Sequence, residues 1–285
     1  MSIAVTGASG QLGRAVVESL LSRSVAASEI VGLVRQPAKA ADLVERGIDL
    51  RVADYAEPQT LSAALAGVDR LLLVSGSEMG KRVEQHTNVI DAAKAAGVGF
   101  IAYTSVLRAE ESPLILAAEH KATEAVLVQS GVEYALLRNG WYWENYTNGL
   151  AGTVERGVLA GSAGNGRVAG AARLDYADAA AVVLTTDGHD GKVYELGGDE
   201  RLTYAGLAAE ISKVAGKEVV YQDLPQAEYA KVLEQAGLPA GYAHVLADSD
   251  AGIAAGALDV DTGDLQKLIG RSSTPVAEVF RAALA

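Results

Sequence analysis

The 285-residue sequence predicts an α/β fold with a doubly wound parallel sheet and a smaller C-terminal domain. Three observations support this prediction. A short apolar strand at 3–5 runs directly into a glycine-rich turn and then into a helical pattern. Apolar strands and helical patterns alternate with short loops through the first half of the chain. From about Asn145 this rhythm gives way to a stretch that we expect to be rich in loops, because it is punctuated by glycines.

The alternation in the first half predicts six strands and five helices. The predicted strands are 3–5, 30–34, 49–52, 70–74, 100–104 and 134–137, and the predicted helices are 10–22, 37–46, 58–66, 81–96 and 116–130. Gly47, Gly97 and Gly131 follow three of these helices as C-terminal caps. Since parallel strands are joined by right-handed crossovers, we expect ligands to lie beyond the carboxyl ends of the strands.

The second half is predicted less regularly. We expect a helix starting at Asp175 as its N-cap, a strand at 192–196, a helix at 203–215, a strand at 219–222 and a helix at 227–236. We predict two domains. The first is a Rossmann domain made of 1–144, to which 171–198 partly returns. The second is a smaller substrate-side domain made of 145–170 and 199–285.

The turn after the first strand has the pattern of a dinucleotide-binding Rossmann motif. Gly7, Gly10 and Gly13 let the backbone turn tightly, approach a pyrophosphate and pack the helix on the strand. Arg35 ends the next strand, about 20 residues further on, where such folds contact the adenosine ribose. A basic residue there suits a 2′-phosphate, so the sequence predicts NADPH, with Lys39 and Arg14 as further basic residues nearby.

Composition excludes several classes of protein. The chain has no cysteine, which rules out disulfides, thiolate metal sites and cysteine nucleophiles. The net charge of −12 argues against nucleic-acid and anionic-membrane partners. We find no secretory signal and no run of about 18 apolar residues, and we therefore expect a cytoplasmic location.

Polar residues follow the fourth and fifth strands. Ser75, Gly76 and Ser77 form a small-residue loop that leaves room for a cofactor. Ser105 stands where a ketone reductase would begin a Ser-Tyr-Lys proton relay, but His120 and Glu124 occupy the four-apart spacing of the Tyr/Lys pair. That pair is either a solvated or ion-paired helix face or part of a site. Because a reduced quinone carries a delocalised charge, a quinone suits a site that lacks a strong relay.

An aromatic segment follows the sixth strand. Trp141, Tyr142, Trp143 and Tyr146 offer flat apolar surfaces for a ring substrate, and Asn145 carries an amide that can bind a carbonyl. We expect at least one of these rings to belong to the core and at least one to line the site.

Other chemistries find no support. The sequence has no Gly-x-Ser-x-Gly elbow and no Walker loop. The four histidines (His86, His120, His189 and His244) lack metal-ligand spacing, so no metal is expected. Asp248-Ser249-Asp250 lacks the other ligands of a calcium loop and is interpreted as a loop or cap.

The chain resembles the NmrA-like branch of the atypical short-chain dehydrogenases/reductases. The motifs that carry the resemblance are VTGASGQLG from Val5, LVRQPAKA from Leu33, IAYTS from Ile101, LRNGWY from Leu137, DYADAA from Asp175 and LTY from Leu202. Within this group the chain looks most like the bacterial NADPH:quinone oxidoreductases that work without flavin. Trp143 departs from the pattern, which has a small polar residue there.

The resemblance implies a set of cofactor contacts and a hydride transfer to a quinone. The implied contacts are Gly7, Ala8, Ser9, Gly10, Gln11, Leu12, Arg35, Ser75, Gly76, Ser77, Gly140, Trp141, Tyr142, Trp143, Glu144 and Asn145. We expect Asn145, Tyr142 and His120 to take part in catalysis, with Asn145 and His120 orienting or protonating the product oxygen. The quinone is expected to stack near Tyr142, Trp143 and Tyr146 in the cleft between the two predicted domains.

Two alternatives stay open. The family also contains regulators that sense the redox state of NADP without turnover, and the missing Tyr/Lys pair fits such a protein. An isoflavone-reductase-like enzyme is less favoured, since that branch carries a lysine where this chain has His120. The sequence leaves the oligomeric state undecided between monomer and homodimer.

Overall fold

The computed structural model describes residues 1–285 and divides them into two compact units. Unit 1 comprises Met1–Val106, Glu119–Arg138 and Leu174–Tyr194, and unit 2 comprises Leu107–Ala118, Asn139–Arg173 and Glu195–Ala285. The sequence assigned 107–118 and 139–144 to the first predicted domain, and 171–198 partly to it. Of these residues, 107–118, 139–144, 171–173 and 195–198 fall in unit 2.

A seven-stranded sheet forms the centre of the first unit, in the order β3-β2-β1-β4-β5-β6-β9. Its strands are β1 (Ile3–Thr6), β2 (Ile30–Val34), β3 (Asp49–Val52), β4 (Arg70–Leu73), β5 (Phe100–Val106), β6 (Glu133–Asn139) and β9 (Lys192–Leu196). The pairings from β3 through β5 are parallel, with Ile3 opposite Ile30 on one side and Arg70 on the other. The strand order reverses direction at β1, which is the switch point where ligands bind in such sheets.

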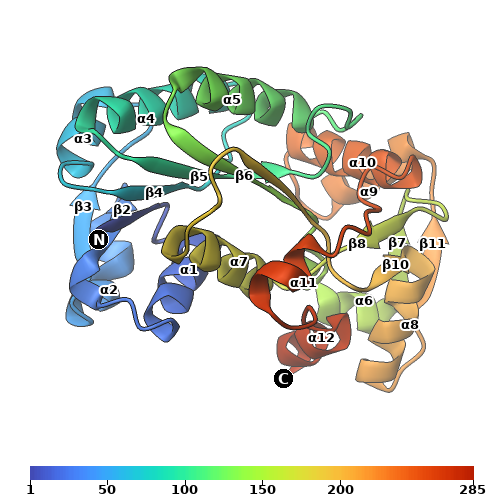
Figure 1. The fold of residues 1–285 in the computed structure, drawn as a ribbon. Coiled ribbons are helices and arrows are strands. Elements are labelled where there is room, and N and C mark those ends of the chain that lie inside the picture. Colours follow the sequence, from blue (N-terminus) through green and yellow to red (C-terminus); the bar gives the residue numbers. More distant parts are fainter. The chain divides into compact units, whose positions relative to one another are not determined.

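Helices cover both faces of this sheet (Figure 1). On one face lie α3 (Pro58–Ala64), α4 (Arg82–Ala96) and α5 (Ala117–Ser130), and on the other lie α1 (Gln11–Ser22), α2 (Ala41–Glu45) and α7 (Arg173–Thr185). Short 3₁₀ turns, η1 (Ala27–Glu29) and η2 (Pro37–Ala40), precede β2 and α2. The predicted doubly wound fold is therefore confirmed.

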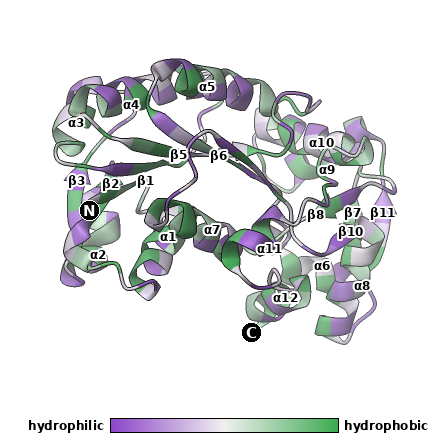
Figure 2. Cartoon of the chain, in the orientation of Figure 1, coloured by the Kyte–Doolittle hydropathy of each residue, from purple (hydrophilic) through white to green (hydrophobic).

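Alternate residues of the central strands build the core. Ala4, Leu71, Leu73, Ile101 and Tyr103 pack in one cluster with residues of α3, α4 and α5, and all five are fully buried. Successive side chains in a strand point to opposite faces, so the intervening apolar residues serve the other face. Figure 2 shows the result, with β5 largely green, a purple end on β6 and both colours on the helices.

The second unit contains two small sheets and six helices. Strands β8 (Arg167–Ala169) and β10 (Arg201–Thr203) pair antiparallel, and β7 (Val158–Gly161) and β11 (Val220–Asp223) pair parallel. The helices are α6 (Leu150–Arg156), α8 (Tyr204–Ala215), α9 (Gln226–Gln235), α10 (Ala240–Ala254), α11 (Asp264–Ile269) and α12 (Val276–Leu284), with η3 (Trp143–Tyr146) as a 3₁₀ turn. Thr203 caps α8, its hydroxyl accepting from the Gly206 N–H.

Two expectations for this part of the chain are wrong. The helix expected from Asp175 starts at Arg173, and Asp175 lies buried in its first turn. The glycine-rich stretch 157–170 holds two strands, because its glycines permit close packing. A Cβ on Gly166 would lie 2.1 Å from the carbonyl oxygen of Ile253. None of the helices combines the length and apolar character that crossing a membrane requires.

Gly13→Ala should lower the free energy of unfolding by about 1–3 kcal/mol, since the new Cβ would overpack the turn. That Cβ would lie 2.3 Å from the Gly7 carbonyl oxygen. Urea unfolding followed by circular dichroism measures the change. The control is Gly241→Ala in α10, where nothing lies within 4 Å and stability should hold or rise by up to ~1 kcal/mol. Equal stabilities for Gly13→Ala and the parent would contradict this packing.

Candidate cofactor and active site

The turn between β1 and α1 presents unpaired backbone N–H groups. Gly7 adopts φ +60°, and the Gly10 N–H donates to the Gly7 carbonyl at 2.8 Å. Gly10 is the N-cap of α1 and has no side chain to cap the first turn. The first N–H groups of the helix, together with the helix dipole, therefore form an anion site.

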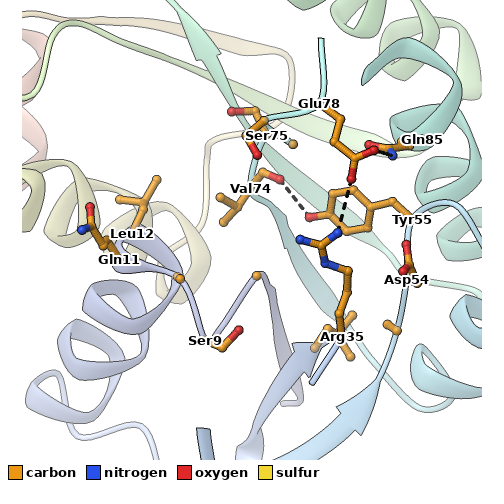
Figure 3. A pocket seen from close by; sticks show the side chains of 17 residues that line it. Ser9, Gln11, Leu12, Arg35, Asp54, Tyr55, Val74, Ser75, Glu78 and Gln85 are labelled. Carbon is orange, nitrogen blue, oxygen red and sulfur yellow. Dashed lines mark hydrogen bonds and ion pairs between the residues drawn. The ribbon is translucent and has the colours of Figure 1, made fainter. Parts of the chain in front are cut away.

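A pocket opens where this turn meets the carboxyl ends of β1, β2, β3 and β4. Seventeen residues line it: Gly7, Ser9, Gly10, Gln11, Leu12, Gly13, Leu33, Arg35, Ala53, Asp54, Tyr55, Val74, Ser75, Gly76, Ser77, Glu78 and Gln85. The structure thus brings together the predicted turn, Arg35 and the loop after β4 (Figure 3).

One predicted contact is corrected. Ala8 does not line the pocket, because it is fully buried and its N–H donates to the carbonyl of Leu33 at 3.2 Å. Of the three basic residues expected near the phosphates, Arg35 lines the pocket. Arg14 instead pairs with Asp42 and donates to the Lys39 carbonyl.

Arg35 already has an acidic partner in this pocket. Its Nη1 lies 3.3 Å from Oε1 of Glu78, and both side chains are largely exposed. Gln85 Nε2 donates to the other oxygen of Glu78 at 3.2 Å, and Lys81 Nζ lies 3.8 Å from it. Figure 3 shows the guanidinium pointing across the pocket to this carboxylate. The sequence analysis missed Glu78 and Gln85, since they lie past the strand end and match no motif.

The loop after β4 is tied to α5 by a largely buried ion pair. Arg82 Nη1 lies 3.0 Å from Oε2 of Glu119, and Arg82 Nε donates to the Gly76 carbonyl at 2.9 Å. The N–H groups of Gly80 and Arg82 both donate to Oε1 of Glu119. These bonds fix both ends of the loop, which places Ser75 and Gly76 at the pocket wall.

Half-buried Tyr55 and fully buried His86 support the floor of the pocket. Tyr55 Oη lies 2.5 Å from Thr6 Oγ1 and donates to the Val74 carbonyl at 2.8 Å. His86 Nε2 accepts from the Gly76 N–H at 2.9 Å, so its Nδ1 carries the proton and donates to Thr123 at 3.1 Å. Burial, and then the charge of Arg82, lower the pKa of His86 to about 3. His86 is therefore neutral at physiological pH.

His120 and Glu124 are neither solvated nor paired with each other. His120 Nδ1 lies 2.7 Å from the Tyr103 hydroxyl, and burial, followed by Arg82 and His86, lowers its pKa to about 3. Glu124 binds the guanidinium of Arg138 through both oxygens, at 3.0 and 2.6 Å, and accepts from Ser105 at 2.5 Å. His120 is therefore neutral at physiological pH, and its part in orienting or protonating the product oxygen stays a prediction.

In unit 2, the segment after β6 divides into core and accessible residues. Trp143 is fully buried against Gly170, where a Cβ would lie 2.5 Å from its ring. The prediction that Trp143 stacks on the substrate is thus wrong. Both oxygens of Glu144 accept from the N–H of Arg173, which caps α7 in place of Asp175.

Of the other members of this segment, Gly140 is buried, Trp141 and Tyr142 are half-buried, and Asn145 is exposed. The Arg173 guanidinium lies 5.1 Å from the centre of the Tyr142 ring, and Asn139 Nδ2 donates to the Tyr142 hydroxyl at 3.4 Å. Gly140 and Trp141 are held by backbone bonds to Leu196 and Ala171. Asn145 is exposed, which leaves its side-chain amide accessible to a ligand. No group of three or more His, Asp or Glu side chains is placed to hold a metal ion.

Comparison with known proteins identifies the class to which this fold and turn belong. Residues 7–187 match the model of a family described as NAD(P)H-binding. The chain belongs to this family, and the resemblance predicted from its motifs is confirmed.

Individual relatives cover nearly the whole chain. It is 55% identical to quinone oxidoreductase 2 of Escherichia coli K12, over 97% of this chain and 96% of the relative. A crystal structure of an NADPH-dependent quinone oxidoreductase from E. coli, complexed with NADPH, matches with a TM-score of 0.96 at 53% identity and covers 99% and 100% of the two chains. A Citrobacter sp. triphenylmethane reductase complexed with NADP(H) matches with a TM-score of 0.95 at 41% identity, over 99% and 100%.

The buried histidine predicts a pH-dependent contribution to stability. The folded pKa of His86 lies below its ordinary value, so its contribution is present above about pH 6.5 and is lost as the pH falls toward 3. His86→Ala should cost about 2–4 kcal/mol at pH 7.5, because it leaves a cavity and the Gly76 N–H unpaired. Between pH 7.5 and 5 the difference from the parent should shrink by about 2 kcal/mol.

Urea unfolding at the two pH values measures this difference. His244→Ala, on the exposed side of α10, is the matched control. Its free energy of unfolding should equal that of the parent at both pH values. A difference for His86→Ala that stays constant with pH would contradict the assignment.

Proposed function

We propose that this protein is an NADPH-dependent quinone reductase that transfers hydride directly to a quinone, without flavin or metal. The observation that carries the proposal is the 55% identity, across 97% of the chain, to a quinone oxidoreductase. The pocket at the glycine turn supports it, since it joins an anion site to Arg35 in one cavity.

The residues present in the pocket fit NADPH. Gly7, Gly10 and Gly13 form the close backbone turn that a pyrophosphate needs, and the start of α1 offers its N–H groups. We assign the 2′-phosphate to Arg35, with Lys39 close by in the chain. The dinucleotide would lie along the loop formed by Ser75, Gly76 and Ser77. When bound, the cofactor supplies the hydride.

Unit 2 would supply the contacts to the quinone. Asn145 has an exposed side chain, so we assign it to orient the quinone or the carboxamide. Tyr142 offers a half-buried ring in the same segment, and Trp143 supports the segment from the core. Catalysis in such a site rests on proximity and orientation.

The arrangement around Glu124 fits a substrate that needs no strong relay. Reduction of a simple ketone makes a localised alkoxide, which requires a positioned acid, whereas a hydroquinone anion spreads its charge over the ring. The position that would hold the relay lysine carries Glu124, which is neutralised by Arg138. The same feature also fits the alternative, a regulator that binds NADP(H) without turnover.

A turnover assay separates these two functions. Purified protein with NADPH and 1,4-benzoquinone should oxidise NADPH well above background, followed at 340 nm. NADPH binding without oxidation would contradict the reductase and favour the regulator, whose partner should then bind in a manner that depends on the cofactor's redox state.

Arg35→Asp should weaken NADPH binding by about 1–3 kcal/mol, because a charge-assisted contact is replaced by repulsion of the 2′-phosphate. Binding of NADH, which lacks that phosphate, should change much less. Calorimetric titration measures both. Unchanged NADPH affinity in the variant would show that Arg35 is wrongly assigned.

Glu78→Gln should act in the opposite direction. It removes the carboxylate that pairs with Arg35 in the free protein, so NADPH should bind more tightly by up to ~1 kcal/mol, the scale of an exposed ion pair. NADH affinity in the same titration is the internal control.

A further inference from the structure

Unit 2 contains a buried carboxylate with no positively charged partner. Asp250 in α10 is 4% exposed, and its Oδ1 accepts from the Tyr204 hydroxyl at 2.5 Å. Its Oδ2 accepts from the N–H of Ser162 at 2.8 Å. Both donors are neutral. Burying a carboxylate without a cation lowers the stability of the fold. We therefore look for a role of Asp250 in function.

The hydrogen bonds continue from Asp250 toward the accessible segment after β6. The hydroxyl of Tyr146 lies 3.4 Å from that of Tyr204, and the two rings meet edge to face with their centres 5.5 Å apart. Tyr146 directly follows Asn145, which we assign to the quinone. A chain of three side chains thus leads from the buried carboxylate to the proposed substrate contacts, all within one unit.

No cationic group acts on Asp250. The Tyr204 hydroxyl of α8 and the Ser162 N–H donate to Asp250 and lower its pKa, whereas Asp223 of β11 raises it. Tyr146 of η3, Tyr229 of α9 and Tyr221 of β11 are neutral neighbours. Asp223 is held by the hydroxyl of Tyr221 at 2.6 Å. Burial is the largest effect and outweighs these two hydrogen bonds, so the pKa of Asp250 is raised to about 6. Asp250 is therefore mostly protonated below about pH 6.

The proposed reaction needs such a proton. Hydride transfer adds two electrons and one hydrogen to the quinone and leaves a hydroquinone monoanion, which requires one proton to become the hydroquinone. His86 and His120 hold no exchangeable positive charge at that pH, and Glu124 is fixed in its ion pair with Arg138.

We propose that Tyr146 donates this proton and that Asp250, acting through Tyr204, restores it. This inference rests on the proposed quinone reductase function. The Tyr146 O–H bond breaks as the O–H bond of the hydroquinone forms. The Tyr204 proton then moves to Tyr146, the Asp250 carboxyl proton moves to Tyr204, and Asp250 takes a proton from solvent. In these terms Tyr146 is the catalytic residue, and Tyr204 and Asp250 are positioning residues.

The direction of the hydrogen bonds makes the relay depend on pH. With Asp250 ionised, the hydroxyls of Tyr204 and Tyr146 donate inward, toward the carboxylate. With Asp250 protonated, the chain reverses and the Tyr146 hydroxyl is free to donate outward. The competent form is therefore the protonated one, and turnover should fall as the pH rises past the pKa of Asp250.

The test compares kcat for NADPH and 1,4-benzoquinone from pH 5 to 7.5 in the parent, Tyr146→Phe, Tyr204→Phe and Asp250→Asn. At pH 5.5 we expect kcat to fall by roughly tenfold in each variant. This is less than the ~100-fold or more that general acid catalysis typically contributes, because the hydroquinone anion spreads its charge over the ring and needs no strong relay. The fall of kcat with rising pH should disappear in all three. The KM for NADPH should stay within about twofold of the parent, because general acid catalysis lowers the barrier of the chemical step only.

Tyr221→Phe is the matched control. Its ring also meets that of Tyr204 edge to face, with centres 5.4 Å apart, but its hydroxyl binds Asp223 and lies outside the chain. It should keep the parent's kcat at pH 5.5, and its kcat should still fall as the pH rises. Tyr204→Phe keeps the ring in place, so it tests the relay even if Asp250→Asn folds poorly.

Three results would overturn the relay. The first is that Tyr146→Phe and Tyr204→Phe keep the parent's kcat and its fall with pH. The second is that the variants lose NADPH affinity in proportion to kcat, which assigns the cluster a structural role. The third is a parent that binds NADPH but does not reduce benzoquinone, which refutes the proposed function first and the relay with it.

Discussion

The approach of helix α1 to strand β1 is the constraint on which the rest of the structure depends. At Gly13 the helix lies so close to the Gly7 carbonyl that there is no space for even a methyl group. This contact points the start of α1 at the carboxyl end of the sheet, where β2 and β4 deliver Arg35 and the loop after Val74. Because the sheet is parallel and reverses its order at β1, all of these groups meet at one edge. The position of the cofactor pocket is thus set by the packing of the backbone, and the side chains then line it.

Charge is distributed differently in the two units. In an acidic chain with a net charge of −12, the buried arginines of unit 1 are neutralised in pairs, Arg82 with Glu119 and Arg138 with Glu124. Arg35 is also paired, but with an exposed partner that an incoming phosphate can replace at little cost. Unit 2 contains the opposite case, a buried acid without a cation. Charge therefore supports binding in one unit and, in our proposal, proton supply in the other.

Much of this could be predicted from the sequence, for reasons that the structure makes clear. Hydrophobic periodicity placed β2 at its observed bounds, because a buried parallel strand is a continuous apolar run. The predicted bounds of β3 also match, although this strand includes Asp49 and Arg51 and is partly exposed. Arg35 and the glycine turn were found because their spacing is set by a βαβ unit. Glu78 was missed because only the folded loop brings it to Arg35. Glu144 was missed as the cap of α7 because it lies far from that helix in the chain.

Local patterns were misleading where residues serve contacts distant in sequence. The glycines of 157–170 suggested a loose loop, yet Gly166 and Gly170 are small because Ile253 and Trp143 pack on them. Asp250 looked like a loop or cap residue and proved to be the buried end of a hydrogen-bond chain.

The most direct test of the central claim, that the β1–α1 edge binds a phosphorylated dinucleotide, is calorimetric titration of the purified protein with NADPH and NADH. We predict one NADPH per chain, bound more tightly than NADH; binding of neither would contradict the account.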